Sequence, residues 1–137
     1  MEPVRVIVVD DSREFRDLVI SIVHRRPELR VIAEACNGEE AVQKIQKLCP
    51  DLVLLDLGLP ILNGLQVART IGKKAPQSKI VFISQESSPE VIHEALSLGA
   101  YGYVLKSDLE SELLQAVSNV LDGKTFLSRT LAGGDVI

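Results

Sequence analysis

Five polar side chains follow short apolar runs along the chain, and their types suit phosphoryl chemistry. Three are carboxylates, one is a hydroxyl and one is an ammonium group: Asp10, Asp11, Asp56, Ser84 and Lys106. Carboxylates bind divalent cations, and an ammonium group can balance the charge of phosphoryl oxygens. If the runs are strands of one parallel sheet, these side chains meet outside its carboxyl edge, where open α/β sheets bind ligands. The pattern therefore predicts a pocket for a divalent metal and a phosphoryl group.

The apolar runs have the composition of strands buried on both faces. Each contains four to six residues that are mostly β-branched or aliphatic: 4–9, 30–35, 52–55, 79–83 and 101–105. Between them, apolar residues recur every three or four positions, as from Phe15 to Val23 and from Leu109 to Val120, which is typical of helices with one apolar stripe. Strand and helix alternate five times. This order predicts an α/β fold, a doubly wound parallel sheet of five strands with right-handed crossovers and helices on both faces.

Residues at the ends of the periodic segments agree with this assignment. Ser12 can cap the first helix, and Ser88 followed by Pro89 fits the start of the fourth. Gly99 and Gly123 fit the positions that directly follow helix ends.

Length and composition predict one domain. The chain has 137 residues, of which 46% are hydrophobic, so it can build one core but not two ordinary ones; we place the domain at 3–122. The net charge of -4 argues against nonspecific nucleic-acid binding by this chain, because phosphate neutralisation needs a basic face. The only basic cluster, His24 to Arg26, falls at a predicted helix end, where cations favour the helix dipole.

Other classes of protein find little support. Cys36 and Cys49 lack metal-site spacing, and we expect both to be small buried or half-buried residues. No apolar stretch approaches the ~20 residues that span a bilayer, and Arg5 and Asp10 interrupt the only candidate signal segment, so we expect a cytoplasmic protein without a membrane partner. The segment 123–137 loses helical period and ends near a Gly-Gly pair, which suggests a tail or the start of a linker to an absent output domain.

Four motifs in order make the sequence resemble the receiver domains of two-component response regulators. They are VVDDS (8–12), LLDLGLPILNG (54–64), FIS (82–84) and GAYGYVLKSD (99–108). The resemblance covers nearly the whole chain and implies the flavodoxin-like (CheY-like) fold with strand order 2-1-3-4-5. The GAYGYVLK segment and the later DGKTFLS further resemble the NarL/FixJ-type subgroup, whose members usually carry a C-terminal LuxR-type helix-turn-helix domain.

The resemblance implies a role for each candidate site residue. Asp56 would be the phosphoacceptor, and a carboxylate at a strand end is a competent nucleophile for phosphoryl transfer. The implied cofactor is Mg²⁺, held by Asp10, Asp11, Asp56 and the Gly58 carbonyl, with Asp11 binding directly and Asp10 through water. Lys106 would pair with Asp56 and then with a phosphoryl oxygen. Ser84 would hydrogen-bond the phosphoryl group, and Tyr103 stands at the position of the switch aromatic.

The resemblance also implies the partners. A sensor histidine kinase or phosphotransfer protein would donate the phosphoryl group, and phosphorylation would favour a homodimer. The chain would be a signalling switch rather than an enzyme, catalysing only its own modification, and DNA would be bound through the absent domain. Two residues depart from the common pattern: Gln85 is larger than the small residue often found after the hydroxyl, and Gly58 leaves one side of the pocket open. Both would tune the lifetime of the phosphoryl group.

Three alternatives remain at this point. A phosphatase of the haloacid-dehalogenase kind also uses aspartates and lysine on a doubly wound sheet, but its nucleophile follows the first strand. A receiver fold could also serve as an interaction module that needs no phosphorylation. A flavin binder is the third, although an acidic pocket would repel the flavin phosphate.

Overall fold

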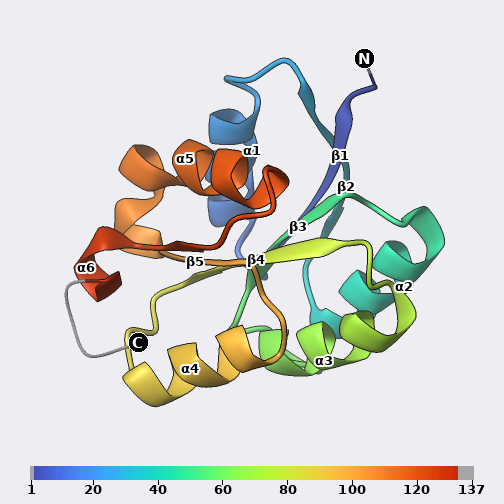
Figure 1. Cartoon of the computed structure of the whole chain (residues 1–137). Helices are drawn as coiled ribbons and strands as arrows, with labels where there is room; N and C mark the ends of the chain where they lie inside the picture. The colour runs from blue at the N-terminus through green and yellow to red at the C-terminus, as the bar shows by residue number, and fades with distance from the viewer. Residues whose placement is uncertain (1, 133–137) are drawn as a thin grey trace.

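Strands and helices alternate along the chain in the computed structural model, which describes residues 2–132 (Figure 1). The elements are β1 (Val4–Val9), α1 (Arg13–Val23), β2 (Leu29–Ala35), α2 (Gly38–Leu48), β3 (Leu52–Asp56), α3 (Gly64–Lys74), β4 (Lys79–Ser84), α4 (Pro89–Ser97), β5 (Gly102–Leu105), α5 (Leu109–Leu121), β6 (Phe126–Leu127) and α6 (Arg129–Ala132). A short 3-10 turn, Lys106–Asp108, joins β5 to α5. The five strands predicted from the apolar runs are all present, each within one residue of its expected bounds.

The predicted helix boundaries are also confirmed. The Ser12 hydroxyl accepts a hydrogen bond from the Phe15 N–H at the start of α1. Ser88 and Pro89 occupy the cap and first position of α4, although the Ser88 hydroxyl donates to Glu90 instead of capping the backbone. Gly99 and Gly123 follow the ends of α4 and α5 with φ of 94° and 81°, a backbone conformation that favours glycine.

The sheet is parallel and has the strand order β2-β1-β3-β4-β5-β6. The first five strands follow the expected order 2-1-3-4-5, in which the chain moves outward in one direction from β1 and then in the other. All five residues of β3 are buried, because this central strand has a neighbour on each side and a helical layer on each face. The carboxyl ends of β1, β3, β4 and β5 therefore lie side by side at one edge.

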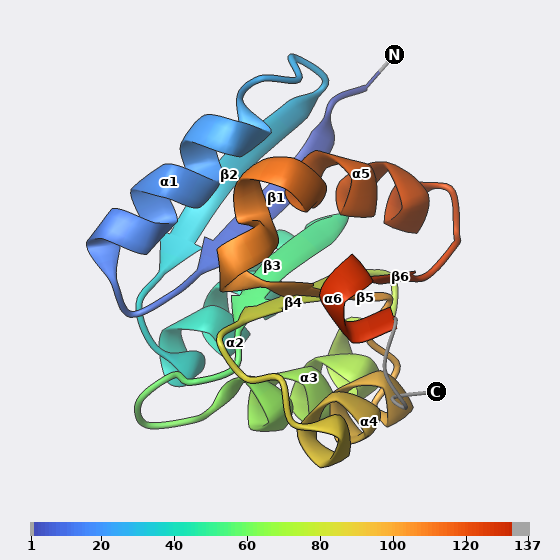
Figure 2. The ribbon, with the colours of Figure 1, turned by 90° about the vertical axis from the view of Figure 1, so that its left-hand side faces the viewer.

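Two helical layers cover the sheet, as Figure 2 shows. Helices α1 and α5 pack on one face, through a core that includes Ile22, Leu113 and Val117. Helices α2, α3 and α4 pack on the other face, where Ile45 and Ile71 are fully buried. These cores hold the strands rigidly beneath the loops that carry the candidate site.

A sixth strand corrects the predicted sheet of five. Phe126 and Leu127 pair in parallel with Gly102 and Tyr103 of β5, and the following turn forms α6. Leu131 of α6 is buried in the same core as α4. Residues 126–132 thus pack against the domain beyond residue 122, within the segment that we expected to be a tail or the start of a linker. The periodicity rule missed them because a two-residue strand and a four-residue helix are too short to show a period. The Gly-Gly pair lies outside the described residues.

The structure also tests the expected burial of the cysteines and the expected lack of a membrane-spanning segment. Both cysteines, Cys36 and Cys49, are exposed, so their predicted burial was wrong. Cys49 caps the C-terminus of α2 with a φ of 47°. Between residues 2 and 132, no helix combines the length and hydrophobicity needed to cross a membrane.

Candidate functional site

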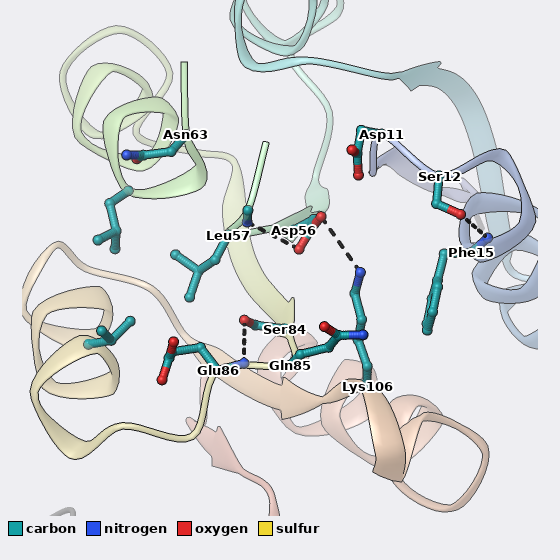
Figure 3. A pocket seen from close by; sticks show the side chains of 13 residues that line it. Asp11, Ser12, Phe15, Asp56, Leu57, Asn63, Ser84, Gln85, Glu86 and Lys106 are labelled. Atoms are coloured by element: carbon teal, nitrogen blue, oxygen red, sulfur yellow. Dashed lines mark hydrogen bonds and ion pairs between the residues drawn. The ribbon is translucent and has the colours of Figure 1, made fainter. Parts of the chain in front are cut away.

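The structure brings the predicted site residues together at the carboxyl edge of the sheet. Asp10 directly follows β1, Asp56 and Ser84 are the last residues of β3 and β4, and Lys106 directly follows β5. A pocket of about 660 Å³ lies at this edge, and its lining includes Asp11, Asp56, Ser84 and Lys106 (Figure 3). Asp10 is 3% exposed and Asp56 is 6% exposed, so two of the three carboxylates are withdrawn from solvent. Asp11 is exposed and lines the pocket.

The turn after β1 fixes the first carboxylate. The Asp10 N–H donates to the Ala35 carbonyl of β2 at 3.1 Å, which continues the strand pairing by one residue. One Asp10 carboxylate oxygen then accepts from the Ser12 N–H at 2.8 Å, a local bond that aspartate commonly makes in turns. Because Ser12 also caps α1, residues 10–12 end the strand, start the helix and place two carboxylates close to that of Asp56.

Close packing holds the phosphoacceptor candidate, Asp56. One of its carboxylate oxygens accepts from the Gly58 N–H at 3.3 Å. Gly64, which begins α3, lies so close that an added Cβ would be 2.4 Å from the Asp56 carbonyl oxygen and 2.7 Å from the Leu57 Cα. A side chain at Gly64 would therefore push the α3 terminus away from the end of β3 and displace Asp56.

Lys106 bridges the buried carboxylates. Its ammonium nitrogen lies 3.0 Å from an Asp10 carboxylate oxygen and 3.6 Å from an Asp56 carboxylate oxygen. It also lies 4.2 Å from the centre of the Phe15 ring, close enough for a cation–π contact. Figure 3 shows this ring beside the lysine side chain. The predicted pairing of Lys106 with Asp56 is present, but the shorter contact is with Asp10.

The site has an excess of negative charge. Carboxylate oxygens of Asp10, Asp11 and Asp56 all lie within 4.8 Å of one another. Among the described residues that line the pocket, Lys106 is the only cation. Burial raises the pKa of Asp56, and the Asp10 charge raises it further, whereas Lys106 and the Gly58 N–H lower it. The surroundings of Asp56 therefore disfavour its charged form relative to a carboxylate in water.

Ser84 and Tyr103 hold the same residue, Glu86. The Ser84 hydroxyl accepts from the Glu86 N–H at 2.9 Å, and the Tyr103 hydroxyl donates to the Glu86 carbonyl at 2.7 Å. The Tyr103 ring is fully buried, and burial raises the pKa of its phenol to about 12, so the hydroxyl remains a donor at neutral pH. A chain of hydrogen bonds thus runs from the pocket hydroxyl to β5.

The structure adds contact residues that we did not predict as part of the site. Phe15 and Gly64 were interpreted only as a helix stripe residue and part of a motif, and Glu86 was not considered. The motif LLDLGLPILNG includes Gly64, so a glycine directly after a cap residue was an available signal for close approach. The Glu86 role had no such signal, because it uses only backbone groups.

The chemistry that this arrangement supports follows from its atoms. A set of carboxylate oxygens around an open space suits a hard divalent cation such as Mg²⁺, which prefers oxygen ligands. A carboxylate that also faces an ammonium group can attack phosphorus while the developing charge is balanced. The pocket therefore contains the groups that phosphoryl transfer to an aspartate would need.

Comparison with known proteins agrees with the fold and the site. The response regulator receiver domain family matches residues 6–118, and the chain belongs to this family. It therefore acts as a signalling receiver module in two-component phosphorelay systems. This membership overturns the haloacid-dehalogenase and flavin-binding alternatives.

The relatives include a NarL protein and a LuxR-family response regulator. The chain is 35% identical over 130 residues to the nitrate/nitrite response regulator protein NarL of Escherichia coli K12, covering 95% of this chain and 60% of that protein. It is 35% identical over 120 residues to a protein-glutamate methylesterase/protein-glutamine glutaminase of Methanosarcina acetivorans, covering 86% of this chain and 34% of that protein. Among solved structures, a LuxR-family two-component response regulator from Aurantimonas sp. SI85-9A1 has a TM-score of 0.91 at 31% identity, covering 96% of this chain and 94% of that one. The chain thus spans only part of the curated relatives.

Proposed function

We propose that Asp56 accepts a phosphoryl group from a phosphohistidine of a sensor histidine kinase or phosphotransfer protein, or from a small phosphodonor. The observation that carries this proposal is the placement of Asp56, a buried carboxylate at the end of β3 with Lys106 and two further aspartates around it. An Asp56 carboxylate oxygen forms the new bond to phosphorus as the phosphorus–nitrogen bond of the donor breaks. The imidazole leaves with that electron pair and takes up a proton.

Each neighbouring group has a defined part in this step. The Gly58 N–H holds one Asp56 oxygen, Oδ1, and the other, Oδ2, faces Lys106 and would be the atom that attacks phosphorus. Lys106 shifts from the carboxylates to a phosphoryl oxygen. There it balances the negative charge that the phosphoryl group brings to Asp56. Because Lys106 already lies between Asp10 and Asp56, little movement is needed.

The residues present fit Mg²⁺. Asp10, Asp11 and Asp56 would hold it with the Gly58 carbonyl, Asp11 directly and Asp10 through water. When bound, the metal neutralises charge between the carboxylate and the phosphoryl oxygens. The excess of charge supports this assignment, because the three carboxylates have one ammonium group, that of Lys106, to balance them. The chain catalyses only its own phosphorylation and dephosphorylation, with one phosphoryl group per molecule.

Ser84 and Tyr103 would carry the signal from the pocket. A phosphoryl oxygen on Asp56 would accept a hydrogen bond from the Ser84 hydroxyl and draw this hydroxyl toward the pocket. That movement would weaken the bond that the hydroxyl accepts from the Glu86 N–H and loosen the loop that Tyr103 holds. The Tyr103 ring already fills the interior, so the change acts through its hydrogen bond rather than by filling an empty space. The surface formed by α4, β5 and α5 would change as a result, and this change would favour a homodimer.

The output of the whole protein would be control of transcription. The relative with 60% of its length covered is a response regulator, and the structural relative belongs to the LuxR family. A LuxR-type helix-turn-helix domain outside this chain would bind DNA, and this acidic chain alone would not. The methylesterase relative offers a second candidate, an enzymatic output domain, because the receiver part matches it at the same identity.

Mass spectrometry of the intact protein tests the proposal. Wild type incubated with Mg²⁺ and acetyl phosphate should gain one phosphoryl mass, and Asp56→Asn should gain none. Asp17→Asn, which removes an exposed aspartate on α1, is the matched control and should be phosphorylated like wild type. Equal phosphorylation of Asp56→Asn would contradict the assignment. Continuing release of phosphate at many equivalents per chain would indicate an enzyme instead of a switch.

A further inference from the structure

Arg16 of α1 reaches back over the turn that carries the acid pair. Its guanidinium donates to the Asp10 carbonyl at 2.8 Å. The same guanidinium pairs with a Glu34 carboxylate oxygen of β2 at 3.1 Å. The Arg16 side chain is only 15% exposed, so it is packed in this position rather than free in solvent. Two neighbouring elements thus fix one side chain against the end of β1.

The Asp10 carbonyl belongs to the peptide that joins Asp10 to Asp11. Its orientation decides where the Asp11 backbone, and hence the Asp11 carboxylate, points. The Asp10 N–H and carboxylate have partners of their own in Ala35 and Ser12. Within residues 2–132, the Asp10 carbonyl has Arg16 as its only donor, and the Asp11 carboxylate accepts no hydrogen bond at all. The aim of Asp11 therefore depends on the peptide that Arg16 holds.

We infer that Arg16 is a positioning residue, which sets the affinity of the acidic pocket for a divalent cation by fixing the 10–11 peptide. This inference rests on the proposed role of the pocket as a Mg²⁺ site. Arg16 itself cannot be a ligand, because a guanidinium has no lone pair to offer. Residues that orient metal ligands from outside typically change metal affinity by about 10- to 100-fold when they are removed.

The charge of Arg16 and its positioning role predict opposite changes in Mg²⁺ affinity when the residue is replaced. A cation beside three carboxylates weakens the binding of a second cation, so Coulomb's law alone predicts that Arg16→Ala binds Mg²⁺ more tightly. Positioning predicts the opposite sign, because the released peptide lets the Asp11 carboxylate turn away from Asp10 and Asp56. The direction of the change in affinity therefore separates the two effects.

Four variants make the comparison. Arg16→Ala removes both contacts. Arg16→Gln makes the same charge change with most of the aliphatic stem kept, which provides the test if Arg16→Ala does not fold. Arg16→Lys keeps the charge but cannot reach Asp10 and Glu34 with a planar fork. Arg13→Gln is the matched control, because this substitution makes the same charge change on the same helix. The Arg13 side chain is 86% exposed.

Calorimetric titration with Mg²⁺ gives the first readout, with circular dichroism in EDTA to confirm folding. We expect the dissociation constant to rise about tenfold in Arg16→Ala and Arg16→Gln, to rise less in Arg16→Lys, and to match wild type or fall slightly in Arg13→Gln. The second readout is the rate of phosphorylation by acetyl phosphate against Mg²⁺ concentration. The concentration for half-maximal rate should rise with the dissociation constant, while the rate at saturating Mg²⁺ recovers to within about threefold of wild type.

The outcomes separate the inference from the proposed function. Unchanged or tighter Mg²⁺ binding by folded Arg16→Gln, with normal binding by wild type, overturns the positioning role and leaves the metal site intact. A lower rate in the Arg16 variants that saturating Mg²⁺ does not restore also overturns it. Absence of Mg²⁺ binding by wild type overturns the metal site and the positioning role with it.

Discussion

The Lys106 ammonium lies closer to Asp10, at 3.0 Å, than to Asp56, at 3.6 Å. The lysine is therefore shared between the two buried carboxylates, and its shorter contact is with Asp10 rather than with the proposed phosphoacceptor. Both carboxylates and the lysine lose water on folding, so each depends on the others for compensation. This sharing makes the pocket sensitive to any change in its charges.

Replacement of the shared lysine should destabilise the metal-free protein. Lys106→Met leaves Asp10 and Asp56 without their cation, and we expect a loss of roughly 2 kcal/mol of unfolding free energy in EDTA at neutral pH. Mg²⁺ should restore more stability to this variant than to wild type, because it replaces the missing charge. Urea denaturation with EDTA or Mg²⁺ measures both effects. Lys73→Met, at an exposed position of α3, is the control; similar curves for the two variants would contradict the shared role.

Removal of the exposed carboxylate should have the opposite effect. Asp11→Asn relieves repulsion among three carboxylates, so it should melt at a higher temperature than wild type in EDTA. It should lose most of its response to Mg²⁺, whereas Mg²⁺ at ten times its dissociation constant should add roughly 1.4 kcal/mol to wild type by mass action. Thermal melts followed by circular dichroism provide the test, with Asp17→Asn as control. Equal melting temperatures and equal Mg²⁺ responses in Asp11→Asn and wild type would refute the metal role of Asp11.

The stability of the metal-free protein should depend on pH through Asp56. Burial, and then the Asp10 charge, raise the pKa of Asp56 above its ordinary value of 3.8, so the folded state holds this proton more tightly than the unfolded chain. The stability that the Asp56 proton contributes is therefore fully present below pH 3.8 and is lost as pH rises through the higher folded pKa. Asp56→Asn has no such proton, and its advantage over wild type should grow from acid to neutral pH. Denaturation in EDTA across this range would test it, with Asp122→Asn as control; a constant difference would contradict it.

The Tyr103 hydroxyl should stabilise the loop after β4. Tyr103→Phe removes the 2.7 Å hydrogen bond to the Glu86 carbonyl and should cost about 1 kcal/mol of unfolding free energy. Hydrogen exchange should become faster in the segment 85–88. Tyr101→Phe is the matched control, because the Tyr101 ring contacts Lys79 while its hydroxyl makes no described hydrogen bond. Unchanged exchange in Tyr103→Phe would separate the tyrosine from the loop.

The Ser84 hydroxyl should be needed for output but not for phosphorylation. Ser84→Ala keeps Asp56, the acid pair and Lys106, so it should still accept phosphate on the proposed phosphoacceptor. Its self-association should respond less to beryllofluoride, a stable mimic of the phosphoryl group, as measured by light scattering. Ser87→Ala, an exposed hydroxyl in the same loop, is the control. The same response in wild type and Ser84→Ala would break the link, and a monomeric wild type with the mimic bound would exclude the dimer.

The sequence predicted the sheet and the pocket edge because both depend on local rules. A buried parallel strand must be a continuous apolar run, and a polar residue that ends such a run must lie at the carboxyl edge, as for Asp56 and Ser84. Contacts that depend on distance across the fold were not predictable in this way. The pairing of Lys106 with Asp10 and the reach of Arg16 to the Asp10 carbonyl depend on how far α1 and β5 lie from the end of β1. The hold of Tyr103 on Glu86 involves a backbone group that every residue carries.

The strand and helix within residues 126–132 were not predicted for a different reason. Their structure depends on tertiary contacts rather than on the hydrophobic pattern of the segment itself. The Ser128 hydroxyl is fully buried and accepts from the Leu105 N–H at 2.9 Å, while the Ser128 N–H donates to the Tyr103 carbonyl at 3.0 Å. The Glu112 carboxylate accepts from the Arg129 N–H at 3.1 Å at the start of α6. None of these partners can be identified from residue types or spacing alone.

The position of β6 has a consequence for how the protein behaves in concentrated solution. Without this segment, β5 would be the outer strand, and its unpaired backbone groups, flanked by buried apolar side chains, would offer a template on which another chain could add a strand. The segment covers that template, and β6 is only two residues long, which makes it a poor template in turn. A chain shortened to residue 122 should therefore aggregate more readily than the chain that retains 126–132, even though every pocket residue would still be present.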